Sequence, residues 1–429
     1  MKKITTRAVS VLLLAALIII GLLVYTIRYI DSGRSWALAF ARSNAAVSGS
    51  LSDRRGQVLA VFDEAGSRYA EDAATRVACY AVTGDYWGRS GTGALTRFWD
   101  DMHGYSLLTG TTRSESGDLR LTVDAGLCRT AYAALAGRKG AVMMMDYRSG
   151  EVLCMVSAPS VDPLDTGEPP EGAYLNRCLS SRFTPGSVFK LVTSVAAIET
   201  VPDLDSQRFA CDGAYEIAGV PIVCTGEHGA PDFEEALAWS CNAAFAQIAL
   251  EIGQKNMIRT VRACGLLDGH ELDGIPSVAG SYPTGEIGGP EFAWSCIGQS
   301  TDLVNPYALL RFISAVANGG TLAEPHLIAG RSGPVTRLLK KSTAEKLGSM
   351  MNYDFVSSYR DTGLFPGLNL CAKTGTAELG DGSSHAWFVG YLPDEAHPYA
   401  FVVLVENGGS GLYAAGPVAN AVLQKAVQG

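Results

Sequence analysis

The chain has only six histidines among its 429 residues, and it contains no Gly-x-Ser-x-Gly motif. Enzymes with a Ser-His-Asp triad need a histidine beside the nucleophilic serine, and α/β-hydrolases carry that serine in the missing motif. His385 is close in sequence to a candidate catalytic strand, and we expect it to be structural. The scarcity of histidine therefore argues against a histidine-based triad.

Basic runs are also missing outside the extreme N-terminus. The net charge is −9 and the pI is about 5.3, whereas proteins that bind nucleic acids usually present a basic patch or stripe. We therefore expect no nucleic acid partner. The composition is 47% apolar and 18% charged, which suits a large hydrophobic core with a small second domain.

The N-terminus predicts a membrane anchor. Twenty uncharged positions run from Ala8 to Ile27, about the length needed to cross a ~30 Å hydrocarbon layer. Lys2, Lys3 and Arg7 precede this run, so the positive-inside rule leaves the N-terminus in the cytosol. A cleaved signal peptide would have a shorter apolar region and a small-residue cleavage site. We therefore predict a single-pass protein of the cell membrane, with everything after residue 30 extracytoplasmic.

Three short motifs bring hydroxyl, amine and amide groups together. In chain order they are Ser187-Val-Phe-Lys190, Ser240-Cys-Asn242 and Lys373-Thr-Gly-Thr376. The i,i+3 spacing places Ser187 and Lys190 on one face of a helix, and the apolar residues that follow predict that this helix is buried. Each motif alone is common by chance, but their order and context favour a serine nucleophile served by lysines.

The first two motifs predict how the serine would react. A serine hydroxyl is a weak nucleophile until a base removes its proton, and Lys190 can act as that base only when it is neutral. Burial, the positive end of the helix and the charge of Lys373 are expected to lower the pKa of Lys190. We expect Ser240 to relay the proton to the leaving amine. Asn242 can hold Lys190 and a substrate amide by hydrogen bonds.

The third motif predicts how a peptide would bind. Lys373, Thr374 and Thr376 suit the terminal carboxylate of a donor peptide. Gly375 has no side chain, so it would let the peptide lie against the strand as an added strand. We therefore expect this motif to bind substrate.

Further segments resemble the transpeptidase domain of class B penicillin-binding proteins. Around the nucleophile, the segment from Phe183 to Lys190 and Asn176-Arg177 are similar to the family's motif region. The other matching segments are the hairpin-like stretch 140–160, Gly298-Gln299, Asn305-Pro306, Ala317-Asn-Gly-Gly320 and Ala386-Trp-Phe-Val-Gly-Tyr391. The resemblance covers about residues 117–429 and is looser from 30 to 116.

This resemblance implies an α+β fold of the penicillin-binding and serine β-lactamase type, with a helical subdomain and an antiparallel sheet. It divides the chain into a cytosolic tail and anchor (1–30), a short pedestal domain (31–116) and a transpeptidase domain (117–429). It also implies that the backbone N–H groups of Ser187 and Thr376 form an oxyanion hole. No cofactor is required for this chemistry.

The secondary structure expected in the transpeptidase domain follows from local patterns. A β segment from Leu119 to Val123, a helix from Ala125 to Ala136 and two strands meeting at Arg148-Ser-Gly150 are expected first. Residues 187–330 are expected to be mostly helical, with a helix that starts at Asp232 and has Glu235 three residues later. Strands are expected at Leu368–Ala377, Ala386–Leu392 and Tyr399–Glu406.

Three functions share these motifs. The first is the cross-linking of peptidoglycan stem peptides by D-Ala-D-Ala transpeptidation, which β-lactams inhibit, and we favour it. The second is hydrolysis, as a β-lactamase or a D,D-carboxypeptidase. The third is a β-lactam sensor, or an activator of a SEDS-type glycosyltransferase; only about seven residues are expected in the cytosol, too few for a sensor's signalling segment. The activator role is compatible with catalysis, since class B proteins resemble partners of SEDS-type glycosyltransferases.

Ten cysteines are many for a protein of this kind. Cys211, Cys224, His228 and Cys241 form a possible Cys3His set for a structural zinc, and some members of the resembled family carry a zinc close to the Ser-x-Asn motif. A Cys211–Cys224 disulfide and free thiols remain alternatives. Six further cysteines are expected to be small core residues: Cys79, Cys128, Cys154, Cys178, Cys264 and Cys371.

Overall fold

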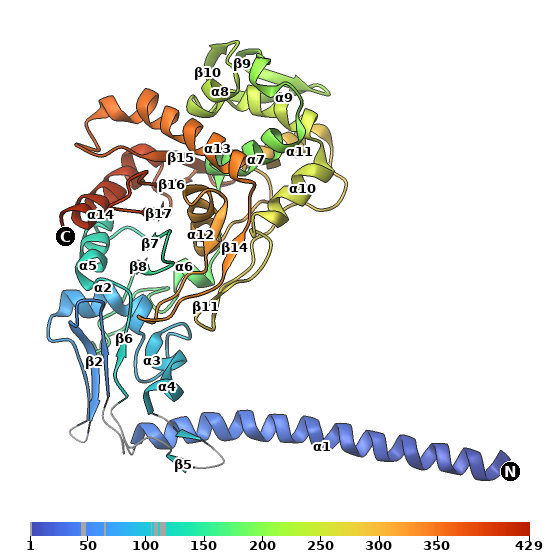
Figure 1. The fold of residues 1–429 in the computed structure, drawn as a ribbon, viewed down its shortest axis with the longest axis vertical. Helices are drawn as coiled ribbons and strands as arrows, with labels where there is room; N and C mark the ends of the chain where they lie inside the picture. The colour runs from blue at the N-terminus through green and yellow to red at the C-terminus, as the bar shows by residue number, and fades with distance from the viewer. Residues whose placement is uncertain (1, 44–48, 64–65, 104, 107–109, 112–116) are drawn as a thin grey trace. The chain divides into compact units, whose positions relative to one another are not determined.

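The computed structural model describes residues 2–43, 49–63, 66–103, 105–106, 110–111 and 117–429 (Figure 1). Two compact units share the chain. The smaller comprises Met1–Ser50, Ala60–Arg68 and Phe98–Leu119, and the larger comprises Leu51–Leu59, Tyr69–Arg97 and Arg120–Gly429. All three motifs lie in the larger unit.

The smaller unit begins with a long apolar helix. Helix α1 extends over Lys2–Ser43, and its segment Arg7–Tyr29 has a mean hydropathy of 2.9 and no buried residues. This segment is long and apolar enough to cross a membrane, which agrees with the predicted anchor, although the helix continues well beyond the expected end at Ile27. The other elements that lie wholly in this unit are α4 (Trp99–His103), β4 (Tyr105–Ser106) and β5 (Gly110–Thr111).

An antiparallel sheet of five strands forms the centre of the larger unit, in the order β15-β16-β17-β7-β8. The strands are β7 (Gly140–Asp146), β8 (Val152–Ala158), β15 (Cys371–Glu378), β16 (Ser384–Tyr391) and β17 (Tyr399–Val405). The strands β7, β8, β16 and β17 are rich in Val, Met and aromatic residues and are almost completely buried, as expected of a sheet covered on both faces, whereas β15 exposes Thr376 and Glu378 near its end. All five were predicted as strands, but the sequence did not indicate that β7 would pair with β17.

Helices cover this sheet (Figure 1). Helices α5 (Ala125–Leu135) and α14 (Gly416–Gln428) pack against each other and against β8 and β17, and α12 (Pro306–Ala317) packs against β7, β16 and β17. Helix α13 (Lys341–Asp354) packs against β15. Further elements are β1 (Gly49–Ser52), β2 (Val58–Asp63), β3 (Gly66–Tyr69), α2 (Ala73–Thr83), α3 (Ala94–Arg97), β6 (Leu119–Arg120), α6 (Arg177–Ser180), η2 (Leu204–Ser206), β11 (Glu271–Leu272), β12 (Ile275–Pro276), β13 (Thr321–Ala323), β14 (Val335–Arg337), η3 (Phe355–Tyr359), η4 (Arg360–Thr362) and η5 (Gly411–Ala415). The α+β class is confirmed.

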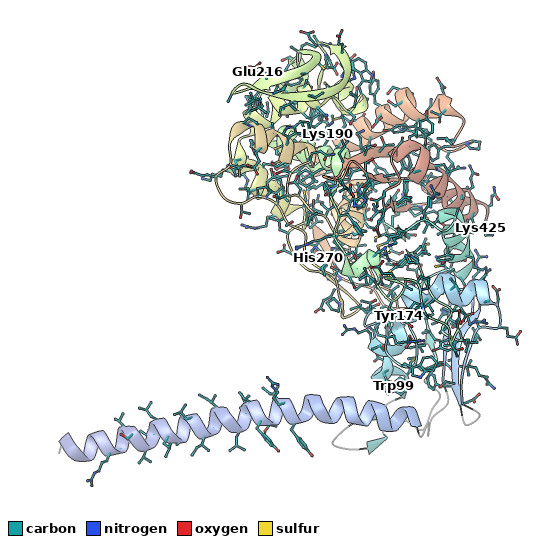
Figure 2. All side chains as sticks on the ribbon, turned by 180° about the vertical axis from the view of Figure 1, so that it is seen from behind. Trp99, Tyr174, Lys190, Glu216, His270 and Lys425 are labelled. Atoms are coloured by element: carbon teal, nitrogen blue, oxygen red, sulfur yellow. The ribbon has the colours of Figure 1, made fainter. Side chains whose placement is uncertain are left out.

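A helical subdomain holds the first two motifs. It contains α7 (Lys190–Thr200), α8 (Phe233–Ala238), α9 (Asn242–Ile252), α10 (Gln254–Ala263) and α11 (Gly289–Ile297). Asp232 caps α8 and forms the predicted capping box with Glu235. Figure 2 shows Lys190 among the packed side chains of this region.

One expectation for this region is wrong. Residues 211–229 form a β-hairpin, β9 (Cys211–Ile217) and β10 (Val220–Gly229), within a segment that we expected to be mostly helical. The two residues between the strands, Ala218 and Gly219, have φ values of 50° and 81°. Two consecutive positive φ values are typical of a tight hairpin turn, and alanine gives little warning of one. Figure 2 shows Glu216 close to the end of this hairpin.

Candidate active site

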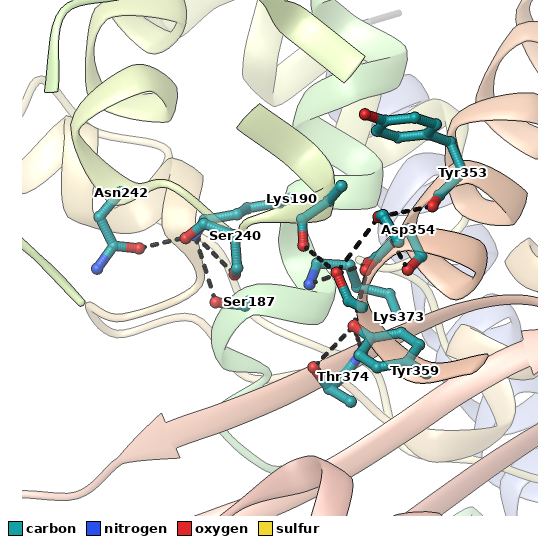
Figure 3. Close-up of polar contacts among 12 residues, drawn as sticks. Ser187, Lys190, Ser240, Asn242, Tyr353, Asp354, Tyr359, Lys373 and Thr374 are labelled. Carbon is teal, nitrogen blue, oxygen red and sulfur yellow. Dashed lines mark hydrogen bonds and ion pairs between the residues drawn. The ribbon is translucent and has the colours of Figure 1, made fainter. Parts of the chain in front are cut away.

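The first motif lies where a short 3-10 turn becomes a helix. Ser187 is in η1 (Gly186–Phe189), and Lys190 is the first residue of α7. We expected an ordinary first helical turn, but the i,i+3 relation survives in the 3-10 geometry, where residues three apart are superposed. The Nζ atom of Lys190 therefore lies 3.3 Å from the Oγ atom of Ser187 (Figure 3).

Lys190 is the hub that connects the first two motifs. Its Nζ atom contacts the Oγ and backbone oxygen of Ser240 at 3.1 and 2.5 Å and the Oδ1 atom of Asn242 at 2.7 Å. Lys190 is completely buried. Burial first, and then the charge of Lys373, lower its pKa from 10.5 to about 7. At neutral pH a large fraction of Lys190 is therefore unprotonated and able to accept a proton.

Ser240 lies in a tight turn between α8 and α9 and has a φ of 53°. A non-glycine residue in this left-handed region is strained, and such strain concentrates at functional sites. The next residue, Cys241, caps α9. The Nδ2 atom of Asn242 then donates to the carbonyl of Val223 on β10 at 2.9 Å. The turn is thus fixed to both a helix and the hairpin.

Behind the third motif lies a buried polar network that the sequence reading missed (Figure 3). Lys373 forms an ion pair with Asp354 at 3.3 Å, and the two side chains are 1% and 0% exposed. The Tyr359 hydroxyl donates to Asp354 at 3.1 Å, lies 3.0 Å from the Thr374 hydroxyl and accepts the Thr374 N–H at 3.3 Å. The sequence signal for this network was Asp354 itself, a carboxylate four residues after Met350 on the apolar face of α13.

The ionisation of this network follows from its burial and its charges. Burial raises the pKa of Asp354 to about 6, although Lys373 opposes the change. For Lys373, burial is the largest effect and lowers the pKa, but Asp354 and Tyr359 together outweigh it and the pKa is raised. Near pH 7 the pair is therefore ionised, and Lys373 on β15 carries a fixed positive charge next to the Asp354 carboxylate.

Position 375 requires a glycine for a different reason from the one we expected. It is buried, and a Cβ atom there would lie 2.9 Å from Val188 Cγ1 and 3.0 Å from the Pro185 carbonyl oxygen. The missing side chain therefore makes room for η1, and the expected role in peptide binding stays a prediction. Similarly, a Cβ atom on Gly186 would lie 2.7 Å from the Thr376 carbonyl oxygen. The two glycines allow the turn that carries Ser187 to lie directly against β15.

An open cavity of about 750 Å³ lies in front of these groups. Its lining residues are Ser187, Val223, Cys224, Thr225, Ser240, Asn242, Trp294, Ile297, Gln299, Thr374, Thr376, Glu378, Leu379 and Gly380. Lys190, Lys373 and Gly375 lie behind this wall. A second cavity of about 590 Å³ reaches Ser240, Lys373 and Thr374 from the side of His228 and Trp239. The candidate catalytic groups are thus accessible from solvent through Ser187, Ser240 and the two threonines.

The four candidate metal ligands come together beside the Ser240 turn. The Nδ1 atom of His228 lies 3.5 Å from the Cys211 sulfur and 3.4 Å from the Cys224 sulfur, and the sulfurs of Cys224 and Cys241 lie 3.7 Å apart. All four donor atoms lie within 4.8 Å of one another. In the structure all ten cysteines, including Cys211 and Cys224, are free thiols. The six cysteines predicted to be core residues are buried, as is Cys296.

His385 does not line either cavity. It is largely buried, its Nδ1 atom accepts the backbone N–H of Asn407 at 3.2 Å, and its ring packs edge-on against Phe183. Burial lowers its pKa. These contacts agree with the structural role expected for it.

This arrangement, a serine whose base is a buried lysine on an α+β scaffold, is that of an acyl transferase that needs no histidine. The penicillin binding protein transpeptidase domain matches residues 140–427, and the chain belongs to that family. Peptidoglycan D,D-transpeptidase PbpA of Mycobacterium tuberculosis strain H37Rv is 29% identical over 338 residues, which cover 68% of this chain and 67% of the relative. Stage V sporulation protein D of Bacillus subtilis is 28% identical, and the alignment covers 70% of this chain and 51% of that protein.

Solved structures show the same fold. A ceftriaxone acyl-enzyme complex of penicillin-binding protein A from M. tuberculosis has a TM-score of 0.74 at 23% identity, covering 90% of this chain and 100% of that one. The D,D-transpeptidase domain of a peptidoglycan glycosyltransferase from Eggerthella lenta has a TM-score of 0.75 at 23% identity, covering 89% and 98%. A complex of PBP2 with MreC from Helicobacter pylori has a TM-score of 0.67 at 24% identity, and the match covers 75% of this chain and 66% of that chain.

Proposed function

We propose that this protein is a peptidoglycan D,D-transpeptidase that cross-links stem peptides through an acyl-enzyme on Ser187 and is inhibited by β-lactams. One observation carries the proposal: the buried Nζ atom of Lys190 lies within reach of the Ser187 hydroxyl, the Ser240 hydroxyl and the Asn242 amide. PbpA of M. tuberculosis supplies the substrate class, since that relative is a peptidoglycan D,D-transpeptidase.

In the acylation step, neutral Lys190 takes the proton of Ser187 while Oγ attacks the carbonyl carbon of the penultimate D-Ala. The negative charge on the carbonyl oxygen is stabilised by the backbone N–H groups of Ser187 and Thr376. When the C–N bond breaks, the leaving D-Ala nitrogen receives a proton from Lys190 through the Ser240 hydroxyl. The ester on Ser187 remains, and Lys190 is neutral again.

In the second step, the amine of an acceptor stem peptide attacks this ester. Its proton passes through Ser240 and Lys190 to Ser187 Oγ, which leaves as the free hydroxyl when the new amide forms. Lys373 supplies a fixed positive charge and Thr374 and Thr376 supply hydroxyl groups for the donor's terminal carboxylate. Gly375 assists indirectly, because it lets η1 approach the strand.

Transfer and hydrolysis can be separated by one assay. The full chain in detergent is given a synthetic pentapeptide ending in D-Ala-D-Ala together with an amine acceptor, and the products are separated by mass spectrometry. We expect D-Ala release with formation of the acceptor adduct, and neither product from the Ser187→Ala variant. A tetrapeptide acid formed without any adduct would mean that the protein is a carboxypeptidase. Rapid, sustained turnover of a chromogenic cephalosporin would mean that it is a β-lactamase.

We also propose that Cys211, Cys224, His228 and Cys241 hold a structural zinc ion. In a tetrahedral site with Zn–S of about 2.3 Å and Zn–N of about 2.0–2.1 Å, two sulfurs are about 3.8 Å apart and a sulfur and a nitrogen about 3.6 Å apart. The observed separations of 3.7, 3.4 and 3.5 Å fit this geometry. The contact between the two sulfurs lowers the pKa of Cys224 and raises that of Cys241, so in the absence of a metal ion the two sulfurs share one proton. The ion would join the hairpin to the Ser240 turn.

Metal analysis tests this zinc site. The purified full chain should contain close to one zinc, and a strong chelator should lower its melting temperature, because a structural site contributes folding free energy. Cys224→Ser should lose the zinc, whereas Cys264→Ala, a buried cysteine on α10's C-terminal side, should keep it. A metal-free native mass with Cys211 and Cys224 two protons lighter would establish the disulfide instead.

Segment 1–30 would anchor the protein with its N-terminus in the cytosol, and residues 31–116 would form a pedestal for the transpeptidase domain 117–429. The orientation follows from Lys2, Lys3 and Arg7 before the apolar segment, and protease should therefore digest the catalytic part from outside in intact spheroplasts.

A SEDS-type glycosyltransferase is the proposed membrane partner. Co-purification from detergent that is lost when α1 is replaced by an unrelated anchor would support it, and failure to co-purify when both are overproduced would contradict it.

A further inference from the structure

Strand β15 is an edge strand of the central sheet, and its open edge lies along the large cavity. Thr374, Thr376 and Glu378 alternate with the buried residues Gly375 and Ala377. Side chains two residues apart share one face of a strand, and all three of these side chains line the cavity. They form a row that begins beside Lys373 and ends at Glu378.

The backbone of this row is also directed to the open edge. The N–H of Thr374 donates to Tyr359, and the carbonyl of Thr376 accepts from the Nε2 atom of Gln299 at 3.2 Å. Neither contact is with β16. Because N–H and C=O of one residue point to the same side of an antiparallel strand, Glu378 also presents its backbone groups to this edge. An added peptide strand can therefore pair along the row once it displaces Gln299.

Glu378 differs from its neighbours in charge. Among the described residues that line the large cavity it is the only one with a carboxylate, and none of the others has a cationic group; their side chains are hydroxyl, amide, cysteine sulfur, apolar or glycine. It is exposed at the cavity wall. A lone carboxylate at the end of a peptide-binding row would attract a cation on the peptide and repel an anion.

We propose that Glu378 selects donor stem peptides whose third residue has a side chain ending in an ammonium group. This inference rests on the proposed function, because it places the donor's terminal carboxylate at Thr374 and Thr376. The donor then runs antiparallel to β15, with its earlier residues toward Glu378. The third residue precedes the terminal one by two positions, about 7 Å, and Thr376 and Glu378 are separated by the same distance along the strand. The side chain of the third residue then extends toward the Glu378 carboxylate, and one as long as lysine's can reach it.

The chemical class follows from the sign of the charge. Lysine, ornithine and a diaminopimelate whose side-chain carboxyl is amidated all present an ammonium group without a neighbouring carboxylate. A free diaminopimelate adds a carboxylate beside that ammonium, so Glu378 disfavours it. Discrimination of this kind uses both an attractive and a repulsive contact.

The test compares two synthetic pentapeptides on the full chain in detergent. They end in D-Ala-D-Ala and differ only at the third residue, which is lysine in one and Nε-acetyl-lysine in the other, and both are assayed with the same saturating excess of a separate amine acceptor. The measured quantity is kcat/KM for D-Ala release. We expect the lysine peptide to react about tenfold faster at low salt, and this preference to shrink as salt screens the exposed carboxylate.

Variants assign the preference to Glu378. Glu378→Gln should reduce it to less than twofold, and Glu378→Lys should invert it. Glu395→Gln removes the same charge from an exposed site remote from the cavity and should keep the full preference. Equal rates for the two peptides in the wild type, or an undiminished preference in Glu378→Gln, would overturn the inference while D-Ala release with formation of the acceptor adduct upholds the proposed function. No D-Ala release from either peptide, with no penicillin adduct on Ser187, would overturn both.

Discussion

At the scale of single residues, the site depends on two lysines in opposite states. Lys190 and Lys373 are both buried, yet only Lys373 has a carboxylate partner, Asp354. Burial without an anion lowers the pKa of Lys190 to about 7, and burial with one leaves Lys373 charged. One lysine can therefore exchange protons while the other supplies a permanent charge.

The pH dependence of acylation tests the state of Lys190. Only the neutral amine removes the serine proton, so the rate rises with pH through the pKa of about 7. We expect the second-order rate constant for benzylpenicillin to rise about tenfold from pH 6 to pH 8 and then to level off. A rate that keeps rising tenfold per pH unit from 8 to 10 would show an ordinary lysine and contradict this assignment.

Asp354 should matter for stability as well as for the site. Asp354→Asn leaves the Lys373 ammonium buried without its anion, and breaking a buried pair in this way costs about 3–5 kcal/mol. We expect the melting temperature of the full chain to fall by several degrees. In the Asp354→Asn/Lys373→Met double variant the loss should be smaller than the sum of the two single losses. Additive losses would mean that the two residues do not interact.

At this scale the sequence predicted the reactive groups but not their support. Ser187, Lys190, Ser240 and Asn242 were identifiable because their spacing is local within each motif. Asp354 and Tyr359 were not, because their meeting with Lys373 depends on how α13 packs against β15. No local pattern encodes that contact.

At the scale of elements, two close backbone approaches hold η1 in place. Gly298 ends α11 with a φ of 82°, its carbonyl accepts the N–H of Gly186 at 2.9 Å, and a Cβ atom on it would lie 2.3 Å from the Gly186 oxygen. Gly186 in turn lies against Thr376. The nucleophile turn is thus clamped between the end of α11 and β15.

A pair of glycine variants tests this clamp. Gly298→Ala and Gly363→Ala place the same side chain at similar positive φ, 82° and 72°, but nothing lies within 4 Å of the Cβ position at Gly363. Both should lose about 1 kcal/mol of stability from the left-handed conformation. Only Gly298→Ala should also slow penicillin acylation, by tenfold or more, because it displaces η1. Equal acylation rates in the two variants would contradict the clamp.

The elements themselves were predictable where the pattern is local. The capping box of α8 and the strands β7, β8 and β15–β17 follow from residue preference and hydrophobic pattern. The β9–β10 hairpin was missed because its turn is Ala218-Gly219 and because most residues of β10 are exposed, so this strand lacks an apolar face. Its importance became visible only when three of its side chains met Cys241.

At the scale of the whole molecule, the order of the motifs carried the family assignment, and the family matches residues 140–427. The joining of β7 and β8 to strands more than two hundred residues later is a long-range pairing that single-sequence patterns do not encode. The division of the N-terminal part stays a prediction. In the larger unit, the α+β fold and the meeting of the three motifs agree with what the sequence predicted.

The most direct test of the central claim is the intact mass of the full chain after reaction with benzylpenicillin, followed by peptide mapping. The account predicts one covalent penicillin per chain, bound to Ser187 and absent from Ser187→Ala. Ser194→Ala, which changes another buried serine on α7, should be labelled as fully as the wild type. An adduct on any other residue, or full labelling of Ser187→Ala, would contradict the account.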